Sequence, residues 1–287
     1  MPISLRRLNR ARPRINLAAI LVPLIASVYV GLLILLPALQ VVAGALAKGW
    51  QPFVETLSSP DLLSAVRLTL LMAVIAVPAN SIFGLAAATA IARRQFPGKA
   101  LLLSVIDLPF SISPVVVGLM LVLLYSPTNG LLRDLVGSLG WKIIFSWPGM
   151  ALATIIVTFP FMAREVIPLL EEEGWDQEEA ARTLGATSWQ VFWKVTLPSV
   201  RWAVLYGLVL TTARALGEFG AVAVVSGNIA GQTQTLPLFV EDSYKQYNTE
   251  LAYGAALVLG GVGLVSLLLK TLVERLVGGV KETKPMT

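Results

Sequence analysis

The sequence predicts an all-α integral membrane protein with six transmembrane helices and both termini in the cytoplasm. Three observations lead to this fold class. Of the 287 residues, 56% are hydrophobic and only 14% are charged, and the mean hydropathy is +0.75, whereas soluble domains carry about 25% charged residues. Six apolar stretches are each long enough to cross about 30 Å of hydrocarbon, which takes roughly 20 residues. Lys and Arg gather at alternate ends of these stretches.

The predicted spans follow one another along residues 17–277, between an N-terminal tail of residues 1–16 and a C-terminal tail of residues 278–287. Each is expected to be helical, because the bilayer core offers the backbone no water to bond with. The first apolar run follows a basic tail but is roughly twice as long as that of a signal peptide, so we expect an uncleaved helix. The spans cover about residues 17–47, 62–92, 101–125, 147–170, 202–226 and 251–277.

The distribution of Lys and Arg orients these spans. Sixteen of them lie in the two tails, at the end of the last span, in the loop after the second span, and in or beside the loop at 171–198, and four lie in the other three loops. Cytoplasmic loops carry the excess of positive charge in membrane proteins. We therefore expect the termini and residues 171–198 to be cytoplasmic.

The third span contains Asp107, Ser111 and Ser113 between apolar residues, with Pro109 and Pro114 beside them. Each proline removes a backbone donor, so the helix is expected to break here. Broken helices at membrane depth mainly face protein or a water-filled cavity, which favours a lining role for this segment over a plain kink. We expect Asp107 to be structural, either capping freed amides or pairing with Arg214.

The loop at 171–198 is polar and predicts two short helices joined at Gly185. Glu178 and Arg182 are spaced to pair on one face of the first helix. Gly185 permits a sharp stop, and Thr187 or Ser188 can cap a second helix at 189–196. Trp189, Phe192 and Trp193 on that helix are expected to pack under the membrane helices or to fill a groove of a partner.

The fifth span carries two charges, Arg214 and Glu218, one helical turn apart. Ionisable residues near mid-bilayer cost about 2.5–3.5 kcal/mol on insertion scales, so they are expected to neutralise each other and to avoid lipid. Two interpretations remain open. The pair holds helices together, or this helix lines a path in which Arg214 offsets the charge of an anion, with Thr211 and Thr212 as donors.

The composition excludes several kinds of chemistry. The chain has no His and no Cys, so a Ser-His-Asp triad, a Cys nucleophile and a thiolate metal site are absent. Asp107 and Glu218 are the carboxylates that an intramembrane enzyme would need to pair, and no protease motif accompanies them. We expect no metal site and no catalytic residues, and the basic balance reflects membrane topology rather than nucleic-acid binding.

The polar loop also carries a spaced pattern, Glu179-Ala180-Ala181, Gly185, Val195 and Leu197-Pro198. This pattern resembles the EAA loop of ABC-transporter permeases, with Val195 where the family usually has isoleucine. The resemblance implies a type I importer permease (MetI-like) fold, in which Glu179, Ala180, Ala181, Gly185, Leu197 and Pro198 lie where an ATPase subunit docks.

Further stretches are similar to sulfate/thiosulfate permeases of the W type (CysW-like), and the similarity covers nearly the whole chain. They are Phe96-Pro97-Gly98, 107–118, 145–150, 213–227 and 231–237. Molybdate permeases share the run at 213–220, so molybdate or tungstate remains the alternative cargo. A self-sufficient secondary anion transporter is a second alternative, with Asp107 and Glu218 as its titratable groups.

The resemblance implies a hetero-oligomer in a bacterial or plastid-type plasma or inner membrane. Its expected partners are a homologous T-type permease, two ATP-binding subunits and an extracytoplasmic sulfate/thiosulfate-binding protein. The chain has no Gly-x4-Gly-Lys-[Ser/Thr] P-loop, so ATP and Mg²⁺ are expected on the partner ATPase subunits and no cofactor on this chain.

Overall fold

A computed structural model describes residues 17–281, without the side chains of 17–20, 273–274 and 276–281. The tail 1–16 and residues 282–287 lie outside the described residues, so the tails predicted there are not placed. Within 17–281 every regular element is a helix, and no strand occurs. The all-α expectation is confirmed for this part of the chain.

Four helices are long and apolar enough to cross a membrane by themselves. The other candidates are two bent pairs, Lys99–Ser111 with Pro114–Tyr125 (109°) and Ser188–Ser199 with Arg201–Leu216 (73°), so the described residues contain four such helices, or up to six spans if each bent pair is one span. The four long helices match the first, second, fourth and sixth predicted spans to within a few residues at most ends, and they are α1 (Leu17–Ala45), α3 (Pro60–Ala92), α7 (Trp147–Glu173) and α14 (Thr249–Lys281).

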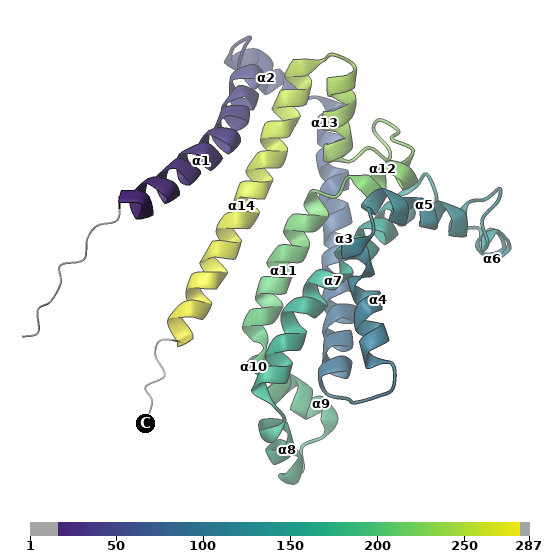
Figure 1. Cartoon of the computed structure of the whole chain (residues 1–287). Coiled ribbons are helices and arrows are strands. Elements are labelled where there is room, and N and C mark those ends of the chain that lie inside the picture. Colours follow the sequence, from purple (N-terminus) through teal and green to yellow (C-terminus); the bar gives the residue numbers. More distant parts are fainter. Residues whose placement is uncertain (1–16, 282–287) are drawn as a thin grey trace, which may run out of the picture.

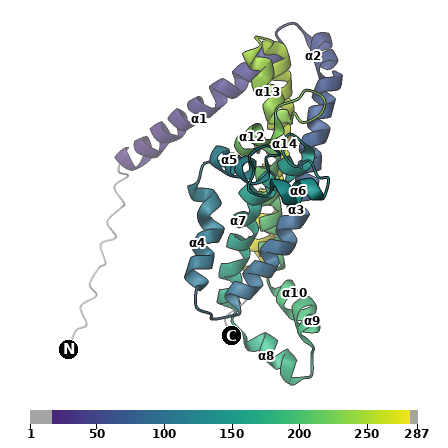
Figure 2. The same ribbon diagram turned by 90° about the vertical axis from the view of Figure 1, so that its right-hand side faces the viewer.

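The third predicted span is two helices, α4 (Lys99–Ser111) and α5 (Pro114–Tyr125), which meet at 109°. Figure 2 shows this bend, with α4 below α5. The expectation that Pro109 breaks the helix is wrong, because Pro109 lies within the last turn of α4. The break falls at Ile112 and Ser113, which are extended, since the residue before a proline is driven out of the helical region. Pro114 then starts α5 at a position where its missing N–H costs nothing.

The fifth predicted span is also interrupted. Helix α11 (Arg201–Leu216) ends before Gly217, and α12 (Gly220–Ser226) begins after Phe219. A continuous helix through residues 202–226 is therefore wrong. The break meets that of the third span: a Cβ added at Gly220 would lie 3.0 Å from Cβ of Pro114.

The core is built around α7. In the most apolar 18-residue windows, 61% of α7 is buried, against 33% for α3 and none for α1. Small residues let α3 approach α7, and Asn80 donates to Thr158 Oγ1 (2.6 Å) and to the Ile155 carbonyl (3.1 Å) across this contact. Lipid tails are as apolar as the side chains, so the hydrophobic effect does not drive membrane helices together. Interhelical hydrogen bonds of this kind contribute to their association instead.

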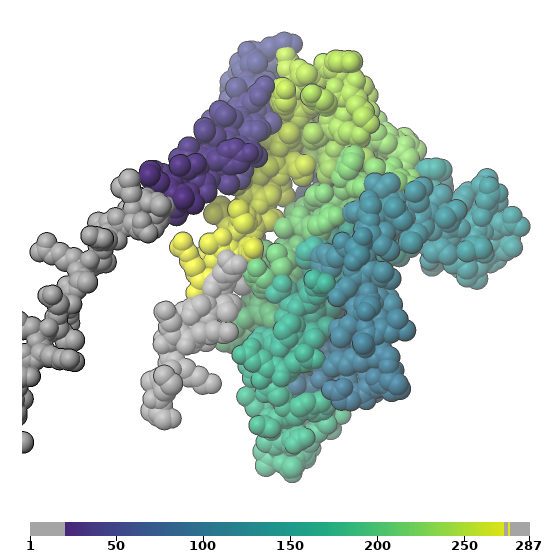
Figure 3. Space-filling view, viewed as in Figure 1, coloured from purple at the N-terminus to yellow at the C-terminus, as the bar shows by residue number. Residues whose placement is uncertain are grey.

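Helix α1 leaves the bundle. Figures 1 and 3 show it in purple, touching the rest near its C-terminal end and diverging from α14. The remaining short helices lie in the connections between the long ones. They are α2 (Trp50–Leu57), α6 (Arg133–Ser138) and α13 (Leu236–Lys245), together with the helices of the 171–198 segment.

Candidate functional site

The segment at 171–198 forms the lower tip of the molecule in Figure 1. Helix α8 (Asp176–Thr183) ends in a turn at Gly185, whose φ of 86° is a left-handed value that other L residues rarely adopt. Thr187 then forms a capping box with Gln190 and starts α9 (Ser188–Val191). The chain continues through a π-helical turn, η1 (Phe192–Thr196), and α10 (Leu197–Ser199). The predicted pair of short helices around Gly185 is present.

Glu178 anchors this segment to the membrane helices. Its carboxylate Oε1 accepts from Arg93 Nε (3.0 Å) and from the Thr196 hydroxyl (2.8 Å), and Arg93 Nη2 lies 2.9 Å away. Arg93 also donates to the Leu170 carbonyl (2.7 Å). Both side chains are more than nine-tenths buried. One ion pair thus ties the end of α3, the end of α7 and both halves of the loop together.

The expected pairing of Glu178 with Arg182 is therefore wrong. Arg182 is exposed, and Glu178 turns inward to a cation from α3. The reason is burial. A buried carboxylate is stabilised best by a cation that is also buried and that supplies several hydrogen-bond donors. The guanidinium of Arg93 does both, whereas Arg182 is exposed to solvent.

The residues of the EAA pattern lie mostly on the outer face of the loop. Glu179, Ala180 and Gly185 are exposed, and Ala181 is half-buried. Leu184, between them, is 88% exposed. The outer face of the loop thus combines an exposed apolar side chain with an exposed carboxylate, that of Glu179. Leu197 and Pro198 lie apart from this surface, in α10.

The aromatic residues of the loop form a cluster beside α3. Trp189 and Trp193 meet edge to face at 5.5 Å, and Phe192 packs on both. Together with residues of α3 and with Arg94 in the connection after it, they line a groove of about 700 Å³. Trp189 remains 70% exposed. The expectation that these side chains pack under the membrane helices is confirmed in part.

Arg214 and Glu218 form the expected ion pair, with Nη1 and Oε2 2.5 Å apart. The Glu218 side chain is 1% exposed and that of Arg214 is 31% exposed. Because α11 ends at Leu216, Glu218 lies in the break, where its Oε1 accepts from the Ala221 amide (3.0 Å) at the start of α12. Glu218 is therefore both the counter-ion of Arg214 and a support of the broken backbone.

The two threonines near this pair differ. Thr212 donates its hydroxyl to the Leu208 carbonyl (2.7 Å), so it is bonded to its own helix. Thr211 is fully buried, and among the described residues its Oγ1 has no hydrogen-bond partner. A buried hydroxyl without a partner is uncommon, so Thr211 keeps unused hydrogen-bonding capacity next to Arg214 along the chain.

Asp107 does not pair with Arg214. Its Oδ1 accepts from Arg164 Nε of α7 at 2.7 Å, so the expected partner was wrong. Arg164 is the charged residue that sequence reasoning missed, because it was counted with the cytoplasmic loop. The sequence signal that could have identified Arg164 is its position inside the apolar stretch predicted as the span 147–170. Ser111 and Ser113 are exposed at the bend between α4 and α5.

Within the described residues, no group of three or more Asp, Glu, His or Cys side chains is placed to hold a metal ion. Two features of the described residues stand out instead. One is the exposed loop at 179–185, and the other is a set of ion pairs near two helix breaks that touch each other.

Comparison with known proteins identifies the family. Residues 80–279 match the family described as "Binding-protein-dependent transport system inner membrane component". The chain belongs to this family. Its members include permease subunits of ABC transporters, and the permease described here shares their fold. It superposes on a chain of a bacterial alginate ABC transporter that was solved in complex with an alginate pentasaccharide-bound periplasmic protein. The TM-score is 0.73 at 16% sequence identity, and the match covers 93% of this chain and 97% of that one.

Several relatives of the permease are similar over most of their length. It is 66% identical over 254 residues to the sulfate transport system permease protein CysW of Synechococcus elongatus, covering 88% of each chain. It is 55% identical to the chloroplastic sulfate permease 2 of Chlamydomonas reinhardtii, over 87% of this chain and 68% of that one. It is 38% identical to the CysT permease of Escherichia coli, over 83% and 86% respectively.

Proposed function

We propose that this chain is a membrane-spanning permease subunit of an ATP-driven ABC importer for sulfate and thiosulfate. The observation that carries the proposal is the 66% identity to a CysW sulfate permease across 88% of both chains. The exposed EAA loop supports it, because a permease without its own nucleotide site needs a docking surface for an ATPase. The chain itself is a non-catalytic transport subunit.

The proposed assembly contains this permease, a homologous T-type permease, two ATP-binding subunits and an extracytoplasmic binding protein. Similarity to CysT supports a paired permease, since both types match one fold. The solved alginate transporter, which carries a periplasmic protein, supports the binding protein. ATP and Mg²⁺ would be held by the ATPase subunits, which dock on Glu179, Ala180, Ala181 and Gly185 and on the neighbouring Leu197 and Pro198.

The proposed topology has six crossings, within residues 17–277, and cytoplasmic termini. The two interrupted crossings are α4–α5 and α11–α12. The EAA loop lies at the same end of the bundle as the basic connection between α3 and α4, which contains Arg93, Arg94 and Lys99. This placement agrees with the excess of positive charge expected in the cytoplasm of a multi-pass plasma or inner membrane protein.

The proposed path runs past the two helix breaks. Arg214, with Glu218 as its fixed counter-ion, offsets the charge of the anion, and Thr211, Thr212, Ser111 and Ser113 supply hydroxyl groups. Asp107, which lies on α4, lines the same side of the proposed path. Moving a divalent anion against an inside-negative potential costs about 2.3 kcal/mol per charge per 100 mV, hence about 4–5 kcal/mol before any gradient, which ATP hydrolysis by partner subunits can supply.

The experiment reconstitutes the complete complex in liposomes and measures ATP-dependent uptake of sulfate, thiosulfate and molybdate. We expect uptake of sulfate and thiosulfate that requires ATP and the binding protein. Molybdate uptake without sulfate uptake would assign the chain to a molybdate or tungstate importer. Uptake by the permease without ATPase subunits would contradict an ABC mechanism.

A variant of the docking loop completes this test. Gly185→Asp places a side chain at a φ that costs roughly 1–2 kcal/mol for an L residue, and it adds a charge to the exposed face. We expect the variant chain to insert normally but to lose co-purification with the ATPase or ATP-driven uptake. Gly137→Asp, at an open position far from the loop, is the matched control.

A further inference from the structure

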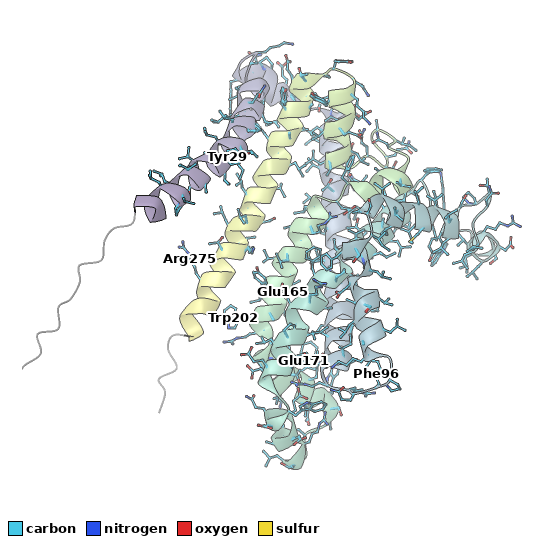
Figure 4. All side chains as sticks on the ribbon, viewed as in Figure 1. Tyr29, Phe96, Glu165, Glu171, Trp202 and Arg275 are labelled. Carbon is cyan, nitrogen blue, oxygen red and sulfur yellow. The ribbon has the colours of Figure 1, made fainter. Side chains whose placement is uncertain are left out.

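Two ion pairs bridge α4 and α7, which run in opposite directions side by side. The outer pair joins Lys99 Nζ to Glu171 Oε1 at 3.1 Å, and the inner pair joins Arg164 Nε to Asp107 Oδ1 at 2.7 Å. The pairs are eight residues apart on α4 and seven on α7, or about 11–12 Å at 1.5 Å per residue. Figure 4 places Glu171 near the EAA loop, and Glu165, the neighbour of Arg164, farther up α7.

The two pairs lie at different depths. Helix α7 has 27 residues and ends at Glu173, so it is about 40 Å long and exceeds the hydrocarbon by about 5 Å at each end if centred. Glu171 then lies at the polar border. Arg164 lies about 14 Å from the end of the helix, inside the hydrocarbon. The outer pair is an interfacial contact, and the inner pair is an intramembrane one.

The inner pair is exposed on the surface of this chain. The side chains of Arg164 and Asp107 are 52% and 41% exposed. Charged groups at this depth avoid lipid and face protein or a water-filled cavity. The exposed edge of the pair therefore faces the interior of the assembled transporter, between this permease and its partner.

The guanidinium group is held with one face covered. The Phe110 ring lies 4.5 Å from its central carbon, and Phe110 in turn packs edge to face on Phe161 at 5.0 Å. Nε is the atom that donates to Asp107, and a guanidinium has five donors in a plane. Further N–H groups on the exposed edge are thus available to a planar pair of oxygens, such as two oxygens of a tetrahedral oxyanion.

We propose that Arg164 binds the imported oxyanion in the half of the path nearest the EAA loop, and that Asp107 is a counter-ion displaced by the anion. The proposal rests on the function proposed above, because it takes the imported oxyanion as the ligand. Asp107 keeps Arg164 neutralised when the path is empty. Sulfate brings two charges and four oxygens, so it replaces the single carboxylate as the partner of the guanidinium.

The position of Asp107 suits such an exchange. It lies four residues before the end of α4, whose last residue, Ser111, precedes the bend of 109° to α5. A change of the bend angle moves Asp107 relative to α7, whereas Arg164 stays in the most buried long helix. The bend therefore controls which partner Arg164 has, and it connects the site to the helix break that α12 touches.

The test exchanges the two charges of each pair. The double variant Asp107→Arg/Arg164→Asp retains an ion pair but removes the cation from α7, and Lys99→Glu/Glu171→Lys is the matched control at the border. Both are assembled into the complete complex, and initial rates of ATP-driven sulfate uptake are measured. We expect the control to keep uptake within about fivefold of wild type, and the inner exchange to lower uptake by about tenfold or more per assembled complex.

A single variant tests the proposal even if the double variant Asp107→Arg/Arg164→Asp fails to assemble. Asp107→Asn keeps Arg164 and removes its competitor, so the KM for sulfate-loaded binding protein is expected to fall by about threefold or more while kcat also falls, because the anion is held longer. Normal uptake by the assembled inner exchange, or an unchanged KM and kcat in Asp107→Asn, would overturn the proposal. A wild-type complex that imports none of the three oxyanions would overturn the proposed function as well.

Discussion

Glu178 and Glu179 are adjacent carboxylates with opposite surroundings. Glu178 is 5% exposed and is bonded to Arg93 and Thr196, whereas Glu179 is exposed. Successive residues of an α-helix are turned by about 100°, so neighbours in α8 point to different faces. One carboxylate fixes the orientation of the helix, and the other lies exposed on the surface proposed to dock the ATPase. A sequence motif that starts at Glu179 omits the residue that holds it in place.

The Arg93–Glu178 pair gives a stability prediction. Arg93→Ala leaves a buried carboxylate without its cation, which is expected to destabilise the fold by about 3–5 kcal/mol. The measurement is the thermal unfolding midpoint of the purified permease in detergent. Arg93→Ala/Glu178→Ala is expected to recover part of the loss, and Glu179→Ala, the exposed neighbour, is expected to leave the midpoint unchanged. A wild-type midpoint for Arg93→Ala would show that the pair contributes nothing.

The Arg214–Glu218 pair gives a transport prediction. Arg214→Gln removes the cation but retains a long polar side chain, and uptake of sulfate by the assembled complex is expected to fall about tenfold. Thr271→Ala is the control, because that hydroxyl lies outside the proposed path, is bonded to the Leu267 carbonyl of its own helix (3.0 Å) and is expected to change uptake little. Reduced stability of Arg214→Gln together with an unchanged rate per assembled complex would assign the pair a purely structural role.

At the scale of elements, the two broken helices act as one unit. Helices α5 and α12 pack closely: a Cβ added at Gly118 would lie 2.8 Å from the Ala221 carbonyl oxygen and 2.8 Å from Cβ of Val224. Such contact requires a residue without a side chain. Because α4 and α11 continue from the two breaks, we expect a movement of one to be transmitted to the other through this contact.

This contact is tested by Gly118→Val. Two methyl groups directed into backbone and Val224 force α5 away from α12, and overpacking of this kind costs about 1–3 kcal/mol. We expect a lower unfolding midpoint and weaker ATP-driven uptake. Gly137→Val, at a position with open space around it, adds the same side chain to a neighbouring segment and is expected to have little effect. Equal midpoints for the two variants would argue against close packing of the breaks.

The elements also show how far sequence reasoning reached. Spans such as 62–92 and 147–170 agree closely with α3 and α7, because hydropathy and proline or serine at helix starts are local signals. The bends were located less well, since the angle between two helix pieces depends on what each packs against. Helix α13 was missed altogether, because its ten residues are too few for a span and its buried half, Leu236–Phe239, depends on contacts with distant helices.

The ion pairs of the candidate site were the least predictable part. Nearest-neighbour spacing suggested partners four residues away, as for Arg214 and Glu218, and this pair is present. Glu178 instead takes a partner 85 residues away, and Asp107, expected to cap freed amides or to pair with Arg214, takes a partner 57 residues away. Pairings over such distances follow from the packing of α3, α4 and α7, which no local pattern contains.

At the scale of the whole molecule, the chain is shaped for an assembly. Helix α1 is apolar on all sides, and none of its most apolar 18-residue window is buried in this chain. The bundle presents a partly exposed ion pair between apolar helices, Arg164–Asp107, and an exposed apolar side chain, Leu184, in the polar loop. Each of these surfaces is costly for a solitary subunit, which agrees with a proposed complex of two permeases and two ATPases.

The buried anchor of the EAA loop has a consequence for how cells make this protein. Glu178 meets Arg93 only after α3 and α7 have been inserted and packed, since the two residues are 85 positions apart. A newly synthesised chain whose helices are misassembled therefore lacks a correctly shaped loop. With the ATPase docking on this loop, as proposed above, its recruitment would be a checkpoint of biogenesis, because only a permease with a complete membrane core presents the loop in the correct shape.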